Sequence, residues 1–163
     1  MALSSEEVDP VAESLSRDLD IVVETQIKNS ESQEKVTRAV SNLFKEHGEL
    51  RVEEKKVEFV SSSLESLRFI KNQFRDRQVR AAARRLLILN KGESDSTYLL
   101  LNKQAATVSI AALCDDPAES ALGPIVLRIR SPKLGEVIDW ITAGFIPKPR
   151  ETLQREEQVI EDN

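Results

Sequence analysis

The chain has 163 residues, of which 40% are hydrophobic and 31% charged, and its formal net charge is -5. This length fits one domain with a real core, and these proportions are typical of a soluble globular protein. No stretch approaches the roughly 18 apolar residues of a membrane span, and the N-terminus lacks the basic and apolar regions of a signal peptide. We therefore expect a cytoplasmic protein with no membrane role.

One cysteine, Cys114, and one histidine, His47, leave little material for catalysis. They exclude an internal disulfide and a His/Cys cluster of zinc-ligand spacing. The chain also lacks the G-x-x-x-x-G-K-[ST] and G-x-G-x-x-G motifs of nucleotide-binding loops. Asp115 and Asp116 should raise the pKa of the neighbouring thiol and weaken it as a nucleophile. With Glu119 they could bind a hard cation, but three acids in one loop are usually solvated. The sequence predicts a non-enzyme without cofactor or metal.

The charge is unevenly distributed along the chain. Residues 1–20 carry a net charge of -5 and residues 151–163 carry -4, which leaves +4 for residues 21–150. Acidic ends with few aromatic residues are typical of disordered or loosely helical tails, which either screen a basic surface or only aid solubility. We expect an acidic N-terminal extension (1–20), a single domain (21–145) and an acidic C-terminal tail (146–163).

The domain begins with a strand followed by a helix. Residues 21–27 alternate in the manner of a half-buried strand. Ser30 and Gln33 form a capping-box start for a helix whose apolar positions repeat at helical spacing until Gly48 ends the pattern. Residues 50–60 then predict two short strands joined by a tight turn, with one bent strand as the alternative.

The next segment is strongly basic: eight cations fall within 24 residues, opposed before the last of them only by Asp76. They are Arg68, Lys71, Arg75, Arg77, Arg80, Arg84, Arg85 and Lys91. The apolar stripe changes direction by well over 100° after Asp76, so a single straight helix would be apolar on two sides. We expect two helices, the second with Asp76 as its N-cap, and each with its arginines turned outward.

Three further strands and a helix complete the domain. Residues 97–101 and 107–113 read as strands joined through Asn102–Ala106. Residues 125–130 alternate so that Arg128 and Arg130 lie on a wet face of the sheet, and Ser131 and Pro132 should begin the last helix. The order β-α-β-β-α-α-β-β-β-α predicts an α+β fold, with a largely antiparallel sheet and helices packed on one face.

The segment Asn102–Ala106 (NKQAA) reads as a turn that begins at Asn102. Ala105 and Ala106 would be small because another element packs over them. Lys103 and Gln104 would then be exposed, and a role in ligand contact is the alternative.

The stretches LLLNKQAATVSIAALCDD, ALGPIVLRIR and VIDWI resemble an archaeal family of small proteins described as RNA-binding and suggested to be exosome-associated. The resemblance covers about residues 21–142, and NKQAA and LGPI are its most specific elements. It implies a fold like that of the large-subunit ribosomal protein L-five, an RNA binder, and it supplies no catalytic residue. Residues 141–144 and the first 20 residues depart from the family pattern.

Arginine side chains in a basic domain suit phosphate, since the planar guanidinium donates two hydrogen bonds at once. The seven aromatic residues form no basic-aromatic run that would stack bases. We therefore expect RNA to be bound by its backbone and shape, and an RNA-processing complex is a further expected partner. The candidate RNA-binding residues are Arg68, Lys71, Arg75, Arg77, Arg80, Arg84, Arg85, Lys103, Arg128 and Arg130. The alternatives are solvated basic faces, or a protein-interaction module such as a homodimer with no nucleic-acid binding.

Overall fold

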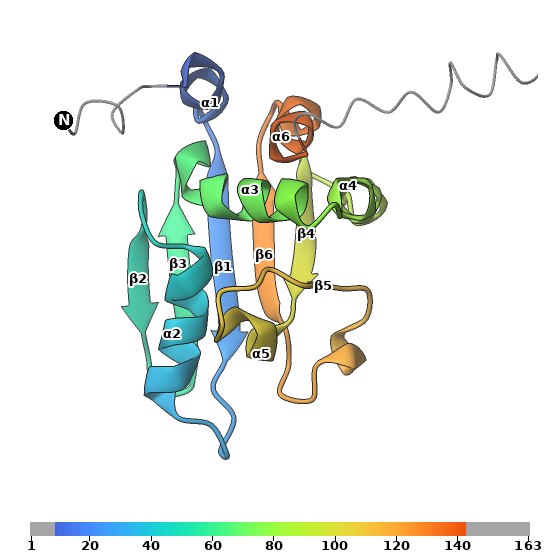
Figure 1. Ribbon diagram of the computed structural model, residues 1–163. Helices are drawn as coiled ribbons and strands as arrows, with labels where there is room; N and C mark the ends of the chain where they lie inside the picture. Colours follow the sequence, from blue (N-terminus) through green and yellow to red (C-terminus); the bar gives the residue numbers. More distant parts are fainter. Residues whose placement is uncertain (1–8, 143–163) are drawn as a thin grey trace, which may run out of the picture.

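Six strands form one sheet in the computed structural model, which describes residues 9–142 (Figure 1). They are β1 (Asp20–Gln26), β2 (Glu49–Val52), β3 (Lys56–Ser61), β4 (Ser96–Leu101), β5 (Leu113–Cys114) and β6 (Ile125–Arg130). Their order across the sheet is β2-β3-β1-β6-β4-β5, and every neighbouring pair is antiparallel. The predicted α+β class and antiparallel sheet are confirmed, and residues 49–61 form two strands, not one bent strand.

The helices are α1 (Pro10–Leu15), α2 (Gln33–Leu43), α3 (Arg68–Asp76), α4 (Arg80–Leu89), α5 (Lys103–Ala106) and α6 (Leu134–Ile141). Two short 3-10 turns, η2 (Leu64–Leu67) and η3 (Pro117–Glu119), complete the element order. In Figure 1, α2, α3 and α5 cross one face of the sheet, and α1 and α6 lie at its upper end. The two basic helices predicted on either side of the phase change are α3 and α4.

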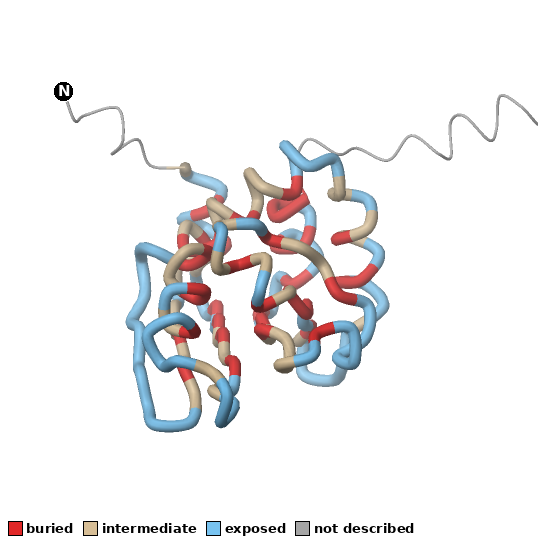
Figure 2. The backbone as a smooth tube through the Cα atoms, turned by 60° about the horizontal axis from the view of Figure 1, so that its bottom comes forward, coloured by how far each residue is buried: buried red, intermediate tan, exposed pale blue. Residues whose placement is uncertain are grey.

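The strands bury alternate residues against the helices (Figure 2). Along β6, for example, Ile125, Leu127 and Ile129 are buried, whereas Arg128 and Arg130 between them are exposed. Strands β1 and β3 alternate in the same way, because successive side chains point to opposite sides of a strand, whereas all four residues of the edge strand β2 are exposed. We call the side of the sheet that bears Arg128 and Arg130 the open face. Its exposure was predicted, and it is confirmed.

The first described residues pack onto the domain. Ala12, Leu15 and Leu19 are buried to 5% exposure or less. Asp9 is the N-cap of α1 and accepts hydrogen bonds from the backbone N–H groups of Val11 and Ala12. The expectation of a disordered or loosely helical extension is therefore wrong for residues 9–19. The C-terminal tail 146–163 and the predicted boundary at residue 145 lie outside the described residues.

Three predicted helix starts are corrected. The N-cap of α2 is Ser32, whose hydroxyl accepts from Lys35 N–H, and not Ser30. Asp76 is the last residue of α3, and α4 begins only at Arg80, after a turn in which Gln78 has a φ of 58°. At α6, Ser131 accepts from the N–H of Lys133 in a local turn, and the helix begins at Leu134.

The strand predicted at residues 107–113 is largely absent. Only Leu113 and Cys114 pair with β4, while the preceding residues form tight turns in which Ile110 N–H bonds Ala105 O and Ser109 has a φ of 62°. The N–H of Ala111 donates to the side chain of Gln73 on α3, and its carbonyl accepts from Arg77 in the turn after α3, so no strand partner is needed. The alternating pattern therefore predicted a strand wrongly here, because the hydrogen-bond partners of these residues come from elsewhere in the chain.

Candidate nucleic-acid interface

Four of the predicted cations converge where α3, α4 and α6 meet. Burial lowers the pKa of Lys71, and the nearby charges of Arg68, Arg75 and Arg80 lower it further, whereas Asp9 raises it. The three arginines therefore lie near enough for their charges to act on Lys71, although the four cations come from two helices. We call Arg68, Lys71, Arg75 and Arg80 the Lys71 cluster. The convergence follows from the phase of α3, which repeats its cations at helical spacing, and from the position of Arg80 at the start of α4.

Trp140 lies beneath this cluster. The Lys71 ammonium and the Arg68 guanidinium are each 5.1 Å from the centre of its ring system. Trp140 is only 6% exposed, and its indole N–H donates to Asp9 at 3.1 Å. The indole ring therefore makes cation-π interactions with both side chains, which stabilises two like charges side by side.

The members of the cluster differ in how far they are neutralised. Arg68 contacts Glu65 at 2.8 Å and Asp9 at 3.1 Å, and Arg75 contacts Asp76 at 3.1 Å. Across residues 9–142, no carboxylate lies within 4.0 Å of the Lys71 ammonium, which contacts the Trp140 ring. Of Arg68, Lys71 and Arg75, Lys71 is therefore the cation whose charge is not already neutralised by a carboxylate.

The remaining cations of the basic helices are used elsewhere. Arg84 contacts Asp139 at 2.6 Å, and Arg85 lies 3.8 Å from Asp115. Arg77 donates to the carbonyl of Ala111 at 3.1 Å. These contacts attach α4 to α6, and α4 and the turn before it to the loops on either side of β5, so the eight-cation run of the sequence is not one continuous cationic band.

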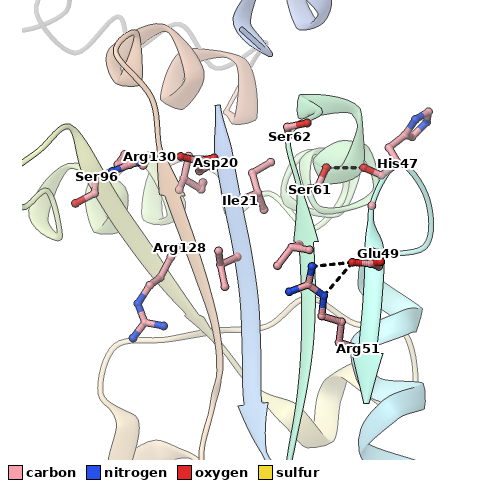
Figure 3. Close-up of a pocket in the computed structure, with 14 residues that line it drawn as sticks. Asp20, Ile21, His47, Glu49, Arg51, Ser61, Ser62, Ser96, Arg128 and Arg130 are labelled. Carbon is pink, nitrogen blue, oxygen red and sulfur yellow. Dashed lines mark hydrogen bonds and ion pairs between the residues drawn. The ribbon is translucent and has the colours of Figure 1, made fainter. Parts of the chain in front are cut away.

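Arg128 and Arg130 lie apart from the cluster, on the open face of the sheet. Arg128 contacts Glu24 at 2.6 Å and Arg130 contacts Asp20 at 2.7 Å. Both side chains line a shallow hollow of about 900 Å³, which Figure 3 shows together with Glu49 and Arg51 of β2. The ion pairs of this face join four acids to four bases: Asp20, Glu24, Glu49 and Glu58 with Arg51, Lys56, Arg128 and Arg130. The open face is thus charged but balanced.

Lys103 is buried, so its predicted exposure is wrong. The side chain is 2% exposed, and its ammonium donates to the carbonyls of Gln26 (2.7 Å) and Leu122 (2.8 Å) and to Glu31 (2.9 Å). All three N–H groups are used, as burial of a charge requires. Lys103 therefore joins the end of β1 to two loops and presents no charge to a ligand.

The rest of the NKQAA segment follows the prediction more closely. Asn102 accepts from Ala105 N–H at 2.8 Å and caps the short helix α5. Helix α2 packs over its small residues, and Asn42 donates to the carbonyl of Ala106 at 2.9 Å. The buried lysine could have been suspected only from its position directly after a helix cap, a weak signal.

The geometry adds no support for nucleophilic chemistry at Cys114. Burial raises the pKa of its thiol, and the charges of Glu119 and Asp115 raise it further. Within residues 9–142, no group of three or more acid, histidine or cysteine side chains could hold a metal ion. The same part of the chain contains no helix that is both long and apolar enough to cross a membrane.

The comparisons with known proteins decide the family. A family model described as RNA binding matches residues 20–131. A UPF0201 protein of Sulfurisphaera tokodaii is 35% identical over 126 residues, which is 75% of this chain and 86% of the relative. A UPF0201 protein of Metallosphaera sedula is 37% identical over 125 residues, or 74% of this chain and 85% of the relative. The chain belongs to the UPF0201 family.

Solved UPF0201 structures have the same fold. One crystal structure of a UPF0201 protein is 28% identical and covers 76% of this chain and 92% of its own, with a TM-score of 0.63. That of the UPF0201 protein of Methanococcus jannaschii is 24% identical and covers 78% and 95%, with a TM-score of 0.65. The family membership indicated by the NKQAA and LGPI motifs is confirmed.

Proposed function

We propose that this UPF0201 protein is a non-catalytic module that binds the phosphate backbone of RNA through the Lys71 cluster. The main support is geometric: Arg68 and Lys71 lie together over the Trp140 ring, each 5.1 Å from its centre. The charges of Arg75 and Arg80 lie near enough to lower the pKa of Lys71. The open face, by contrast, carries an equal number of acids and bases in ion pairs. The RNA-binding description of the matching family model supports the same ligand.

The contacts in the cluster suit exchange with phosphate. Ion pairs between exposed side chains contribute only about 0–1 kcal/mol, because water and salt screen them. The Arg75–Asp76 pair, with both side chains more than half exposed, is of this kind. A phosphate can therefore replace the Asp76 carboxylate on Arg75 at little cost and take an additional contact from Lys71.

Recognition should not depend on base stacking at this site. Trp140 is buried beneath the cations, and Tyr98, which is 40% exposed, lies on β4 opposite Arg128, on the open face. RNA would then be read through its backbone and shape, with affinity that is nearly independent of sequence.

The cluster is tested by removing equal charge from the two faces of the molecule. We expect Lys71→Gln with Arg75→Gln to weaken RNA binding about tenfold or more at low salt, because two of the four proposed phosphate contacts are lost. The matched control, Arg128→Gln with Arg130→Gln, removes the same charge from the open face and should change affinity much less. Fluorescence anisotropy with labelled single-stranded RNA measures both. A greater loss in the control would move the interface to the open face and contradict the proposal.

The salt dependence gives an independent measure of the contact. Four phosphate contacts predict a slope of about -3 in log affinity against log salt, at roughly -0.7 per contact on a single strand. The Lys71/Arg75 double variant should reduce the magnitude of this slope by about 1.4. A slope near zero for the intact protein would leave no phosphate interface and would favour a protein adaptor.

The proposal extends to an RNA-processing assembly in the cytoplasm. This extension is supported by the suggested exosome association of the family that the sequence resembles. Affinity purification of the tagged protein with and without ribonuclease treatment tests it. Recovery of ribonucleases or other processing factors is expected, and recovery of neither RNA nor such factors would contradict it.

A further inference from the structure

Strand β2 forms one edge of the sheet, and its outer side carries no strand among the described residues (Figure 1). The N–H of Glu53 donates to the carbonyl of Lys56 at 2.9 Å, which fixes the phase of the β2–β3 ladder. In an antiparallel ladder, alternate residues exchange hydrogen bonds with the neighbouring strand. Arg51 therefore bonds to β3, whereas the N–H and C=O groups of Leu50 and Val52 point out of the sheet edge.

The side chains of this edge are also unusual for exposed positions. Leu50 is 38% exposed and Val52 is 43% exposed, and both lie on the helix-covered side of the sheet, opposite Phe59 and Val57. Exposed apolar residues beside outward-pointing backbone groups are a template for another strand. No Lys or Pro interrupts residues 49–52.

The charges of β2 favour another copy of itself as that strand. Two β2 strands can pair through their outward-pointing groups in three twofold registers, which differ in the residue of the second copy that lies opposite Leu50. With Leu50 opposite Gly48, Glu49 faces Glu49. With Leu50 opposite Val52, Arg51 faces Arg51. In the middle register, Leu50 lies opposite Leu50. Only the middle register places Glu49 opposite Arg51, and symmetry makes this contact twice. Facing opposite charges stabilise a strand pair and facing like charges oppose it.

We propose that two copies of this protein associate through antiparallel pairing of their β2 strands, with Leu50 opposite Leu50 about a twofold axis perpendicular to the sheet. In this arrangement the two sheets join into one, and the helices of both copies lie on the same side. Glu49 and Arg51 already lie together on the open face, 2.8 Å apart (Figure 3). Pairing exchanges this contact in each of the two chains for two equivalent contacts between the chains, so no charge loses its partner. Such an isologous interface is self-complementary and closes at two copies.

The pairing is tested with two charge-reversal variants, each of which should lose self-association alone but form a mixed dimer with the other. Arg51→Glu puts glutamate opposite glutamate, and Glu49→Arg puts arginine opposite arginine, so each variant should self-associate at least tenfold more weakly than the native protein. When the two variants are mixed, each Glu faces an Arg again, and we expect a mixed dimer to form. Sedimentation velocity over a concentration series measures self-association, and one fluorescently labelled variant reports the mixed species.

A third variant tests the backbone of the edge. Leu50→Pro removes an N–H that the β2–β3 ladder does not use, so it should keep the fold and abolish association. Circular dichroism of each variant checks the fold, and the Lys71 cluster is untouched, so RNA binding is read out separately. A native protein that remains monomeric at every concentration overturns the proposal, as does a dimer that persists in all three variants or single variants whose mixture remains monomeric.

Discussion

Lys103 is a charged residue that belongs to the packing of the protein and not to its surface. Its three hydrogen-bond partners, Gln26, Glu31 and Leu122, are 77, 72 and 19 residues away in the chain. The sequence places Lys103 correctly after a turn-forming asparagine, but it cannot show that distant carbonyls converge on the ammonium. The turn at this position was therefore predictable from the sequence, whereas the burial of the Lys103 side chain was not.

Replacing Lys103 by methionine should destabilise the protein strongly. The Glu31 carboxylate and two carbonyls would lose their donor inside the protein, and breaking a buried ion pair costs about 3–5 kcal/mol. Lys35 and Lys103 both line a pocket between α2 and α5, and Lys35 is exposed. Lys35→Met is therefore the control and should change the free energy of unfolding by less than about 0.5 kcal/mol. Urea unfolding followed by circular dichroism measures both. Similar losses for the two variants would show that the buried contacts of Lys103 contribute little.

At the scale of elements, the periodic segments were predictable and the segments with distant partners were not. The residues before β5 alternate like a strand, but the N–H of Ala111 bonds the Gln73 side chain and its carbonyl accepts from Arg77. Helix α1 was missed because its acidic sequence resembles a solvated tail, whereas its apolar residues Ala12 and Leu15 are buried. The Lys71 cluster was predictable only in part. The phase change at Asp76 predicted the two helices that carry it, but the position of its cations over Trp140 depends on tertiary packing.

Gly48 shows why the chain can turn closely into β2. A Cβ at this position would overlap the Phe59 ring and would lie 2.6 Å from the carbonyl oxygen of Val60. Gly48→Ala should therefore lower the free energy of unfolding by about 1–3 kcal/mol, the usual cost of overpacking. Gly135→Ala is the matched control, because a Cβ there meets nothing within 4 Å and alanine favours a helix by about 1 kcal/mol. Thermal unfolding should move in opposite directions for the two variants, and equal shifts would contradict the close approach.

At the scale of the whole molecule, Asp9 connects the first helix to the last. Burial alone would raise the pKa of its carboxyl, but hydrogen bonds from Trp140, Ala12, Arg68 and Val11 together lower the pKa below its ordinary value of 3.8. A carboxyl group whose pKa is lowered by folding stabilises the protein above its unfolded pKa, and this contribution is lost as pH falls through the folded pKa.

The pH dependence of stability should therefore report this connection. Below pH 3.8 we expect the native protein to lose more stability on acidification than Asp9→Asn, which has no charge to lose at this position. At neutral pH the variant should be the less stable of the two. Melting temperatures measured by calorimetry between neutral and acidic pH test the difference. Parallel melting curves for the two proteins would show that Asp9 does not stabilise the native fold through its charge.

Two residues that contact the cations of the Lys71 cluster, Trp140 beneath them and Asp9 beside them, lie outside the residues that the family model matches. The cations themselves lie within residues 20–131, but Trp140 and Asp9 lie beyond either end of that range. Trp140 nevertheless belongs to the VIDWI segment that resembles the family, whereas Asp9 and α1 lie within the first 20 residues, which depart from the family pattern. The ring beneath the Lys71 cluster can therefore be shared among UPF0201 proteins while the carboxylate beside it differs. With the cluster as the proposed RNA site, we expect that grafting the α1 segment between relatives changes RNA affinity without altering the sheet, and measured affinities should follow the origin of that segment.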